Sequence, residues 1–149
     1  MRAFKKHLAA RACLLLLLAL LGLSLGTAAM AGQPEVDIQA QGQAKHWLGL
    51  LDQGNYDEAY RQAAPVLQAA VTPAKWRQMM TQLAAKTGPS KERKLLHGRA
   101  TQDLPGAPKG NYYLAVFEPN FTRQPKLLEQ VALILESDGQ WRVAGYYLK

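Results

Sequence analysis

The stretch LLEQVALILESDGQWRVAGYYL, residues 127–148, decides the fold of this chain. It holds two apolar runs, 127–136 and 141–148, of the composition and length that strands favour. The pair Asp138-Gly139 lies between them and is typical of a two-residue type I′ hairpin turn, because that turn needs positive φ at both positions. The stretch therefore predicts an antiparallel hairpin.

Two further strands are predicted upstream, at 92–101 and 111–121. A connection rich in Gly and Pro, 104–110, joins them, and residues 122–125 lead into the C-terminal hairpin. Since each connection is short enough for neighbouring strands to run in opposite directions, the second half of the chain predicts a four-stranded antiparallel meander.

The first half has helical periodicity instead. Apolar residues at spacings of three and four predict helices over 36–53 and 56–64, with a further turn at 66–71. A third helix is predicted to begin at Thr72-Pro73, where Thr supplies a capping oxygen and Pro tolerates the first helical position, and to end at Gly88-Pro89. Helices followed by strands indicate an α+β domain with the helices packed on one sheet face.

The N-terminal residues have the pattern of a signal peptide. Basic residues precede an uncharged apolar run of 13 residues, 13–25, and the small residues Ala29-Met30-Ala31 follow it. This run is shorter than the roughly 20 residues that span a membrane. We expect cleavage after Ala31, a single domain over 32–149, and a periplasmic or secreted location; the alternative is a retained N-terminal membrane anchor.

Composition excludes several classes of protein. A chain of 149 residues with one Cys is too small for separate cofactor and substrate domains, and it has neither a disulfide scaffold nor a Cys metal cluster. Four of its 18 basic residues lie in 1–31, so 14 basic residues face 11 acidic ones from Gly32 onward, which argues against a nucleic-acid partner. His46 and His97 lie on different elements, and we predict no metal site and no cofactor.

The predicted connections also set the pairing of strand residues. A two-residue turn at Asp138-Gly139 pairs Glu136 with Trp141, Ile134 with Val143, Leu133 with Ala144, Ala132 with Gly145, and Val131 with Tyr146. A four-residue loop at 122–125 places Glu118 opposite Glu129. Two carboxylates across a ladder repel, so we expect compensation by Arg93 or Arg99, by a cation, or by a shared proton; the other interpretation is a shifted register or solvated strand ends.

This register gives the sheet two largely apolar faces. One carries Tyr112, Leu114, Val116, Glu118, Glu129, Val131, Leu133 and Tyr146, and the other carries Tyr113, Phe117, Phe121, Trp141 and Tyr147. One face must cover the helices, and the other must meet a partner or form the wall of a cavity. The candidate ligand-binding residues are the aromatic and acidic set Tyr112, Glu118, Glu129, Trp141 and Tyr146; no residue is assigned a catalytic role.

Several segments resemble one family over 40–148. They are 104–112, Glu129 with Val131, and 138–146, together with Trp47, 52–56 and Trp76 upstream. Their layout is similar to the exported bacterial "domain of unknown function 4019" family. The resemblance implies a small periplasmic or membrane-anchored protein, and by analogy a cone-shaped fold like that of nuclear transport factor 2-like and cystatin-like domains. It implies no catalytic residue.

We therefore expect a non-catalytic exported domain that binds a protein, a peptide or a small apolar ligand in the bacterial envelope. One alternative is a small pocket enzyme with a strand carboxylate as general base and a Tyr as donor. Another is a structural subunit of an envelope complex. A desolvated Glu118 or Glu129 with a Tyr within hydrogen-bond reach favours the enzyme, whereas acids at a rim and aromatics on an open surface favour a binding module.

Overall fold

The computed structural model describes residues 34–149, in which four helices precede a four-stranded antiparallel sheet, as the α+β prediction requires. The elements are α2 (Pro34–Asp52), α3 (Tyr56–Arg61), α4 (Pro65–Ala70), α5 (Pro73–Thr87), β1 (Ser90–Thr101), β2 (Tyr112–Phe121), β3 (Glu129–Leu135) and β4 (Trp141–Leu148). The predicted signal peptide, 1–31, and its cleavage after Ala31 lie outside the described residues.

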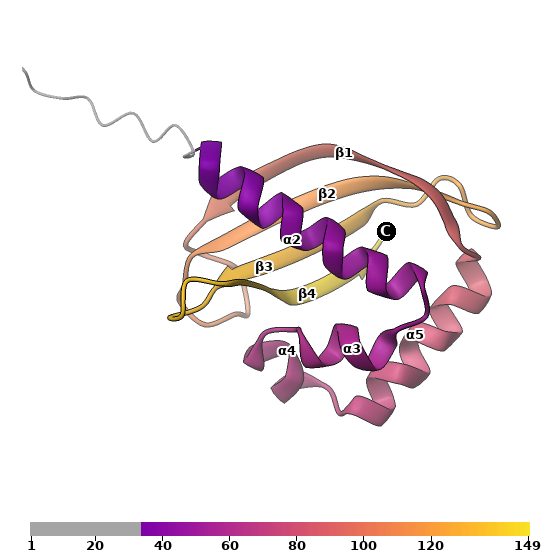
Figure 1. The fold of residues 1–149 in the computed structure, drawn as a ribbon, viewed down its shortest axis with the longest axis horizontal. Helices are drawn as coiled ribbons and strands as arrows, with labels where there is room; N and C mark the ends of the chain where they lie inside the picture. Colours follow the sequence, from indigo (N-terminus) through magenta and orange to yellow (C-terminus); the bar gives the residue numbers. More distant parts are fainter. Residues whose placement is uncertain (1–33) are drawn as a thin grey trace, which may run out of the picture. The chain divides into compact units, whose positions relative to one another are not determined.

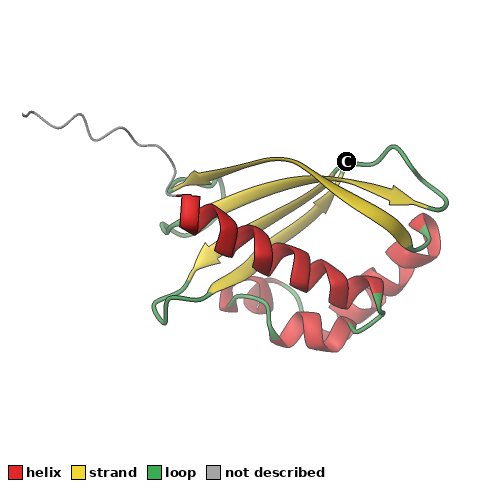
Figure 2. Ribbon diagram, turned by 45° about the horizontal axis from the view of Figure 1, so that its top comes forward, coloured by secondary structure: helices red, strands yellow, loops and turns green. Residues whose placement is uncertain are grey.

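The sheet is a meander in the order β1-β2-β3-β4. All four helices lie on the same side of it, and α2 crosses that side diagonally (Figures 1 and 2). α2 contacts every strand, while α3 lies between α2 and α5. The arrangement is a two-layer domain in which one sheet face is covered by helices and the other is not.

The local signals at the helix ends act as the sequence predicts. Thr72 is extended and its hydroxyl accepts a hydrogen bond from the Lys75 amide at 3.3 Å, with Pro73 at the first helical position of α5. Gly88 ends α5 with φ of +70°, a conformation that other residues rarely adopt. The predicted further turn at 66–71 is a separate helix, α4, because Pro65 is preorganised for the first position of a helix.

Aromatic side chains fill the layer between α2 and the sheet. Trp47 is fully buried, and its ring lies 5.7 Å from that of Trp76 and 5.6 Å from that of Tyr146, centroid to centroid. The Trp47 indole N–H donates to the Ala59 carbonyl at 2.8 Å, which fixes α3 against α2. Rings at these separations stabilise each other beyond their buried area.

Tyr113 on β2 lies across β1 at Gly98. A Cβ atom at Gly98 would stand 2.0 Å from the Tyr113 hydroxyl oxygen, so only glycine leaves room for this ring. The hydroxyl accepts a hydrogen bond from the Gln41 side-chain amide of α2 at 2.7 Å. Gly98 thus allows a strand residue to be tied to the helix above it.

The C-terminal hairpin has a three-residue loop, which corrects the predicted two-residue turn. Glu136 N–H donates to the Gln140 carbonyl at 3.0 Å, and only Gly139 in this loop has positive φ, whereas a type I′ turn needs two such residues. Leu133 therefore faces Val143, Ile134 faces Arg142 and Leu135 faces Trp141, against the predicted pairs. A bulge next to Leu133 then restores the predicted pairs of Ala132 with Gly145 and of Val131 with Tyr146.

The predicted register between β2 and β3 is wrong by one residue. Phe117, not Glu118, lies opposite Glu129, and Glu118 points the other way, exposed and opposite Lys94 of β1. A slip of one residue moves side chains to the other face. The face that packs on the helices consequently combines the two predicted sets: Tyr113, Ala115, Phe117, Val131, Leu133, Trp141 and Val143.

The other sheet face is only partly open. Tyr112 and Leu114 are buried there, and the Tyr112 hydroxyl donates to the Pro108 carbonyl at 2.6 Å, which ties the connection between β1 and β2 to the strand. Tyr147, by contrast, is 56% exposed. The second sheet face therefore carries apolar side chains, as predicted, but part of it is covered by the connection between β1 and β2.

Candidate functional site

A cavity of about 170 Å³ lies between the helices and the sheet, near the C-terminal ends of α2 and α5. One part of its wall is apolar and comes from both layers: Leu51, Tyr56, Met80, Leu83, Ala84 and Phe121. The other part is polar, with Asp52, Arg93, Glu129 and Tyr146. An apolar wall with a few converging polar groups is the usual composition of a small-molecule site.

The ends of two helices create this space. α2 stops at Asp52, just before Gly54 with φ of +74°, and α5 stops at Gly88. β1 follows with an irregularity between Ser90 and Arg93. Bulges commonly change the direction in which a strand side chain points, and Arg93 reaches across the sheet to Glu129 on β3.

The polar part is a hydrogen-bonded cluster around Arg93, which we call the Arg93 cluster: Asp52, Arg93, Glu129 and Tyr146. Arg93 binds Asp52 through two N–H groups, at 2.7 and 3.0 Å. Its Nε donates to Glu129 Oε2, and Nη2 lies 3.4 Å from Glu129 Oε1. The Tyr146 hydroxyl donates to Glu129 Oε1 at 2.8 Å.

Burial controls the protonation of this cluster. Glu129 is fully buried, and desolvation raises the pKa of its carboxyl, against the opposing effect of the Arg93 charge. Burial also raises the pKa of the Tyr146 hydroxyl, which keeps that hydroxyl a donor. Desolvation would lower the pKa of Arg93, but hydrogen bonds and charge from Asp52 and Glu129 outweigh it and raise that pKa, so the guanidinium stays charged.

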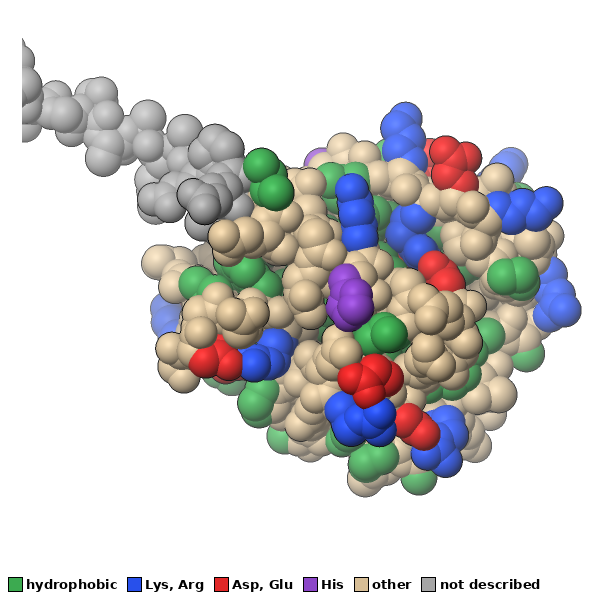
Figure 3. Space-filling view, in the orientation of Figure 1, with side chains coloured by type: hydrophobic (Ala, Val, Ile, Leu, Met, Phe, Trp, Pro, Cys, Tyr) green, Lys and Arg blue, Asp and Glu red, His purple; other side chains and the backbone are tan. Residues whose placement is uncertain are grey.

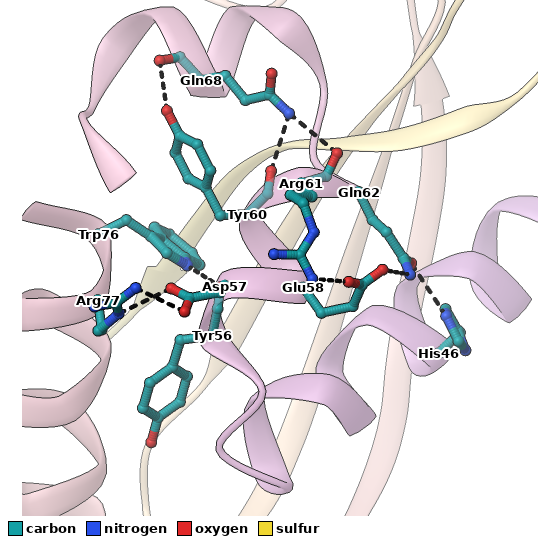
Figure 4. A network of polar contacts seen from close by, with 10 residues as sticks. All are labelled: His46, Tyr56, Asp57, Glu58, Tyr60, Arg61, Gln62, Gln68, Trp76 and Arg77. Carbon is teal, nitrogen blue, oxygen red and sulfur yellow. Dashed lines mark hydrogen bonds and ion pairs between the residues drawn. The ribbon is translucent and has the colours of Figure 1, made fainter. Parts of the chain in front are cut away.

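A second polar network holds the helices behind the cavity (Figure 4). Arg77 of α5 binds Asp57 of α3 with two hydrogen bonds, at 2.9 and 2.7 Å. The Trp76 indole N–H donates to the Tyr56 carbonyl at 2.8 Å. The Tyr56 ring points away from the polar groups drawn there and forms part of the cavity wall, so these contacts fix one apolar wall residue.

The structure brings together two of the five sequence-predicted binding residues, Glu129 and Tyr146. Tyr112 is buried on the opposite sheet face, and Trp141 packs in the core with its ring 6.3 Å from that of Tyr113. Glu118 is exposed and lines a separate hollow with Glu92 and Lys94. The five residues therefore do not form one site, and whether each binds a ligand stays a prediction.

From the sequence, Arg93 is predicted only as one possible compensation for the pair Glu118 and Glu129, and Asp52 is not predicted as a site residue. Asp52 and Arg93 are 41 residues apart and belong to a helix end and a strand. The available signal was a carboxylate at the end of the first helix, two residues before Gly54. Only the crossing of α2 over β1 places these two side chains within contact.

A larger hollow, of about 390 Å³, lies on the other sheet face. The connection between β1 and β2, residues of α4, and Tyr147 line it. Among its described lining residues only Lys149 is charged, and none of them belongs to a buried cluster of ionisable groups like that of the first cavity. The cavity with the Arg93 cluster is therefore the stronger candidate site.

Within 34–149, no group of three or more metal-binding side chains lies close enough together to hold a metal ion. None of the helices described is long and apolar enough to cross a membrane. Acidic and basic side chains are interspersed on the face seen in Figure 3, with several in direct contact.

Comparison with known families identifies the chain. The model of the family described as "protein of unknown function (DUF4019)" matches residues 43–146. The chain belongs to this family. The resemblance seen in the sequence is therefore confirmed. No curated protein matches the chain.

Two solved structures have a similar fold. One is Aln2 from a Streptomyces species, at 10% identity and a TM-score of 0.52, covering 78% of this chain and 91% of Aln2. The other is a protein from Catenulispora acidiphila, at 15% identity and a TM-score of 0.51, covering 78% of this chain and 92% of that protein. At such identities the likeness concerns the fold alone.

Proposed function

We propose that this DUF4019 protein is an exported, non-catalytic domain that binds a small, largely apolar molecule in the cavity beside the Arg93 cluster. The observation that carries the proposal is the combination of an apolar wall with a fully buried Glu129 held by Arg93 and Tyr146. A buried ion pair contributes little net stability compared with apolar packing. Its presence at the end of a cavity is therefore better explained by a ligand than by folding.

The volume limits the ligand. A cavity of about 170 Å³ is close to the roughly 150 Å³ of an engineered apolar cavity that holds benzene. The part of a ligand that enters this cavity is therefore about the size of a single ring with one small polar group. This narrows the expectation of a protein, peptide or small apolar ligand to the last of the three.

The proposed location depends on the N-terminal segment. If residues 1–31 are a signal peptide, the exported protein begins at Gly32 and resides in the periplasm or the medium. Mass spectrometry of the protein from an envelope fraction tests this. A mass that starts at Met1 would overturn the cleaved, exported form and favour the membrane-anchored one.

The cavity itself can be tested with benzyl alcohol as the probe. Titration followed by amide NMR should shift resonances around the cavity, including those of Leu51, Ala84 and Arg93. Ala84→Leu places a larger side chain on the cavity wall and should abolish the shifts. Ala85→Leu is the matched control, because Ala85 is the next residue of α5, is exposed, and is not among the lining residues. Equal loss in both variants, or no shifts in the wild type, would overturn the proposal.

A specific observation favours a second function. Glu129 is desolvated and accepts a hydrogen bond from Tyr146, the condition set above for a pocket enzyme with a carboxylate base. Against this, both Glu129 oxygens already accept hydrogen bonds from Arg93, and a general base must be able to reach its substrate. Recovery of a bound compound chemically changed by the wild type, but not by Glu129→Gln protein, would establish the enzyme.

A further inference from the structure

The residues of the Arg93 cluster have more hydrogen-bond acceptors than donors. A guanidinium offers five N–H groups, and contacts to Asp52 and Glu129 use four of them. A carboxylate offers about four acceptor positions. Described residues fill two on Asp52 and three on Glu129, so each carboxylate can accept further hydrogen bonds.

The cavity wall also has more acidic than basic side chains. Among the described lining residues, two are acidic, Asp52 and Glu129, and one is basic, Arg93. At a pH above the pKa of Glu129, which burial raises, both carboxylates are ionised and a single guanidinium leaves an excess of one negative charge. Glu129 is fully buried and the side chain of Arg93 is only 13% exposed, so water screens this charge less than it would on the surface.

The rest of the wall suits an apolar body attached to a cation. Tyr56 and Phe121 contribute aromatic side chains to the cavity, and aromatic faces attract organic cations. Asp52, whose side chain is 31% exposed, is the more accessible of the two carboxylates. An incoming positive group can therefore reach Asp52 without breaking the Tyr146–Glu129 hydrogen bond.

We infer that the ligand of this cavity is a small organic ammonium compound, with its N–H groups on the Arg93 cluster and a body of about one ring against Leu51, Tyr56 and Phe121. The inference depends on the proposed function, since it specifies the chemical class of molecule bound at the same site. A carboxylate of the same size meets the excess negative charge and finds one N–H of Arg93 to bind.

Three probes with one phenyl ring and head groups of similar size separate the head-group chemistry: benzylammonium, benzyl alcohol and benzoate. Dissociation constants are measured by NMR titration at a fixed ionic strength near 0.15 M, where charges more than about 8 Å apart are largely screened. Benzylammonium should bind roughly tenfold or more tightly than benzyl alcohol, because hydrogen bonds with an ionised partner are about twice as strong as neutral ones. Benzoate should bind more weakly than both.

The outcomes distinguish the inference from the function on which it depends. If benzyl alcohol binds as tightly as benzylammonium, or benzoate binds most tightly, the ammonium inference is overturned and the cavity remains a binding site. If none of the three probes shifts resonances around the cavity, the inference and the proposed function fail together.

Asp52→Asn tests the contact directly. This variant should reduce the preference for benzylammonium over benzyl alcohol about tenfold, so that the two probes bind about equally. Asp103→Asn is the matched control: it removes the same charge from the surface pair with Lys109, and Asp103 is not among the lining residues of the cavity. If Asp103→Asn weakens benzylammonium as much as Asp52→Asn, the attraction is general to the protein and the inference is wrong. Glu129→Gln, which keeps the size of the side chain, provides a second variant with the same expected direction.

Discussion

The layer between helices and sheet differs sharply between its centre and the end near Gly88. At the centre, Trp47 is fully buried among aromatic rings and its indole N–H is satisfied by a backbone carbonyl. At the other end, the layer holds a cavity and the Arg93 cluster. Tyr146 belongs to both regions, because its ring packs against Trp47 while its hydroxyl binds Glu129.

The two regions contribute differently to the stability of the fold. The chain fills most of the layer with apolar side chains, whose burial is the main favourable term in folding. Where α2 and α5 end, it instead places two carboxylates and a guanidinium, whose desolvation costs about as much as their attraction returns. A region that contributes less to folding than its neighbour is where a binding function can be sought.

The largest effect is expected at the packed centre. Trp47→Ala removes a fully buried ring and its hydrogen bond to Ala59, and it should lower the free energy of unfolding by about 3–5 kcal/mol. Chemical denaturation measures the change. Met79→Ala on α5 is the control, because Met79 is 43% exposed and lies outside the core cluster, so its loss should change stability by no more than about 0.5 kcal/mol. A loss at Trp47 as small as that at Met79 would contradict the packed centre.

Arg93→Leu should have the next largest effect, about 3 kcal/mol, because it leaves Glu129 buried without its counter-charge. The double variant Arg93→Leu/Glu129→Leu should recover most of that loss, since apolar side chains replace the buried pair. Denaturation of both proteins measures this recovery. A double variant that is less stable than Arg93→Leu alone would mean that the cluster is a stabilising element, and the contrast with the packed centre would disappear.

These two regions were not equally predictable from the sequence. The helical spacing predicted the helices that carry Trp47 and Trp76, and the Thr72-Pro73 and Gly88-Pro89 signals bounded α5 correctly, because such signals act locally. The order of strands followed from the short connections. The α+β class and the elements that form the centre of the layer could therefore be predicted from the sequence.

The site required information that is not local. Whether Glu129 faces the helices depends on the register between β2 and β3, which the connection after Phe121 sets and which was predicted one residue away. The Asp-Gly turn was misjudged because Asp138 takes negative φ and caps the loop through its carboxylate, which accepts from the Gln140 amide at 3.0 Å. The meeting of Asp52 with Arg93 depends on how α2 crosses the sheet, which no spacing in the sequence specifies.

Gly98→Ala tests the packing of Tyr113 from the sheet side, and we expect it to have an intermediate effect on the free energy of unfolding. The added Cβ atom would stand 2.0 Å from the Tyr113 hydroxyl oxygen and 2.5 Å from Cζ, so the ring must move and its bond with Gln41 is lost. We expect a loss of about 1–3 kcal/mol in the free energy of unfolding, the usual range for overpacking. In a Tyr113→Leu background the same substitution should cost much less. If Gly98→Ala lowers the free energy of unfolding equally in both backgrounds, the clash with Tyr113 is not the cause of the loss.

The smallest effect concerns the pH dependence of stability, and it depends on the sign of the Glu129 shift. Burial raises the pKa of this carboxyl in the folded protein above the 4.5 of an unperturbed Glu, so the folded state binds the proton more tightly than the unfolded one. Its contribution to stability is therefore fully present below pH 4.5 and is lost as the pH rises through the folded pKa. Lowering the pH from 7 to 5 should stabilise the wild type relative to Glu129→Gln.

The pKa of the Asp138 carboxyl is shifted in the opposite direction to that of Glu129. Its hydrogen bonds with Arg142 and the Gln140 amide lower its pKa from 3.8 to about 2, so its contribution is lost only as the pH falls from about 4 toward 2. Between pH 7 and 5 it does not titrate, and it is common to both proteins. Urea denaturation of wild type and Glu129→Gln at the two pH values gives the difference. If the wild type instead loses stability relative to Glu129→Gln on acidification, the Arg93 charge outweighs burial at Glu129, and this end of the layer behaves as an ordinary stabilising ion pair.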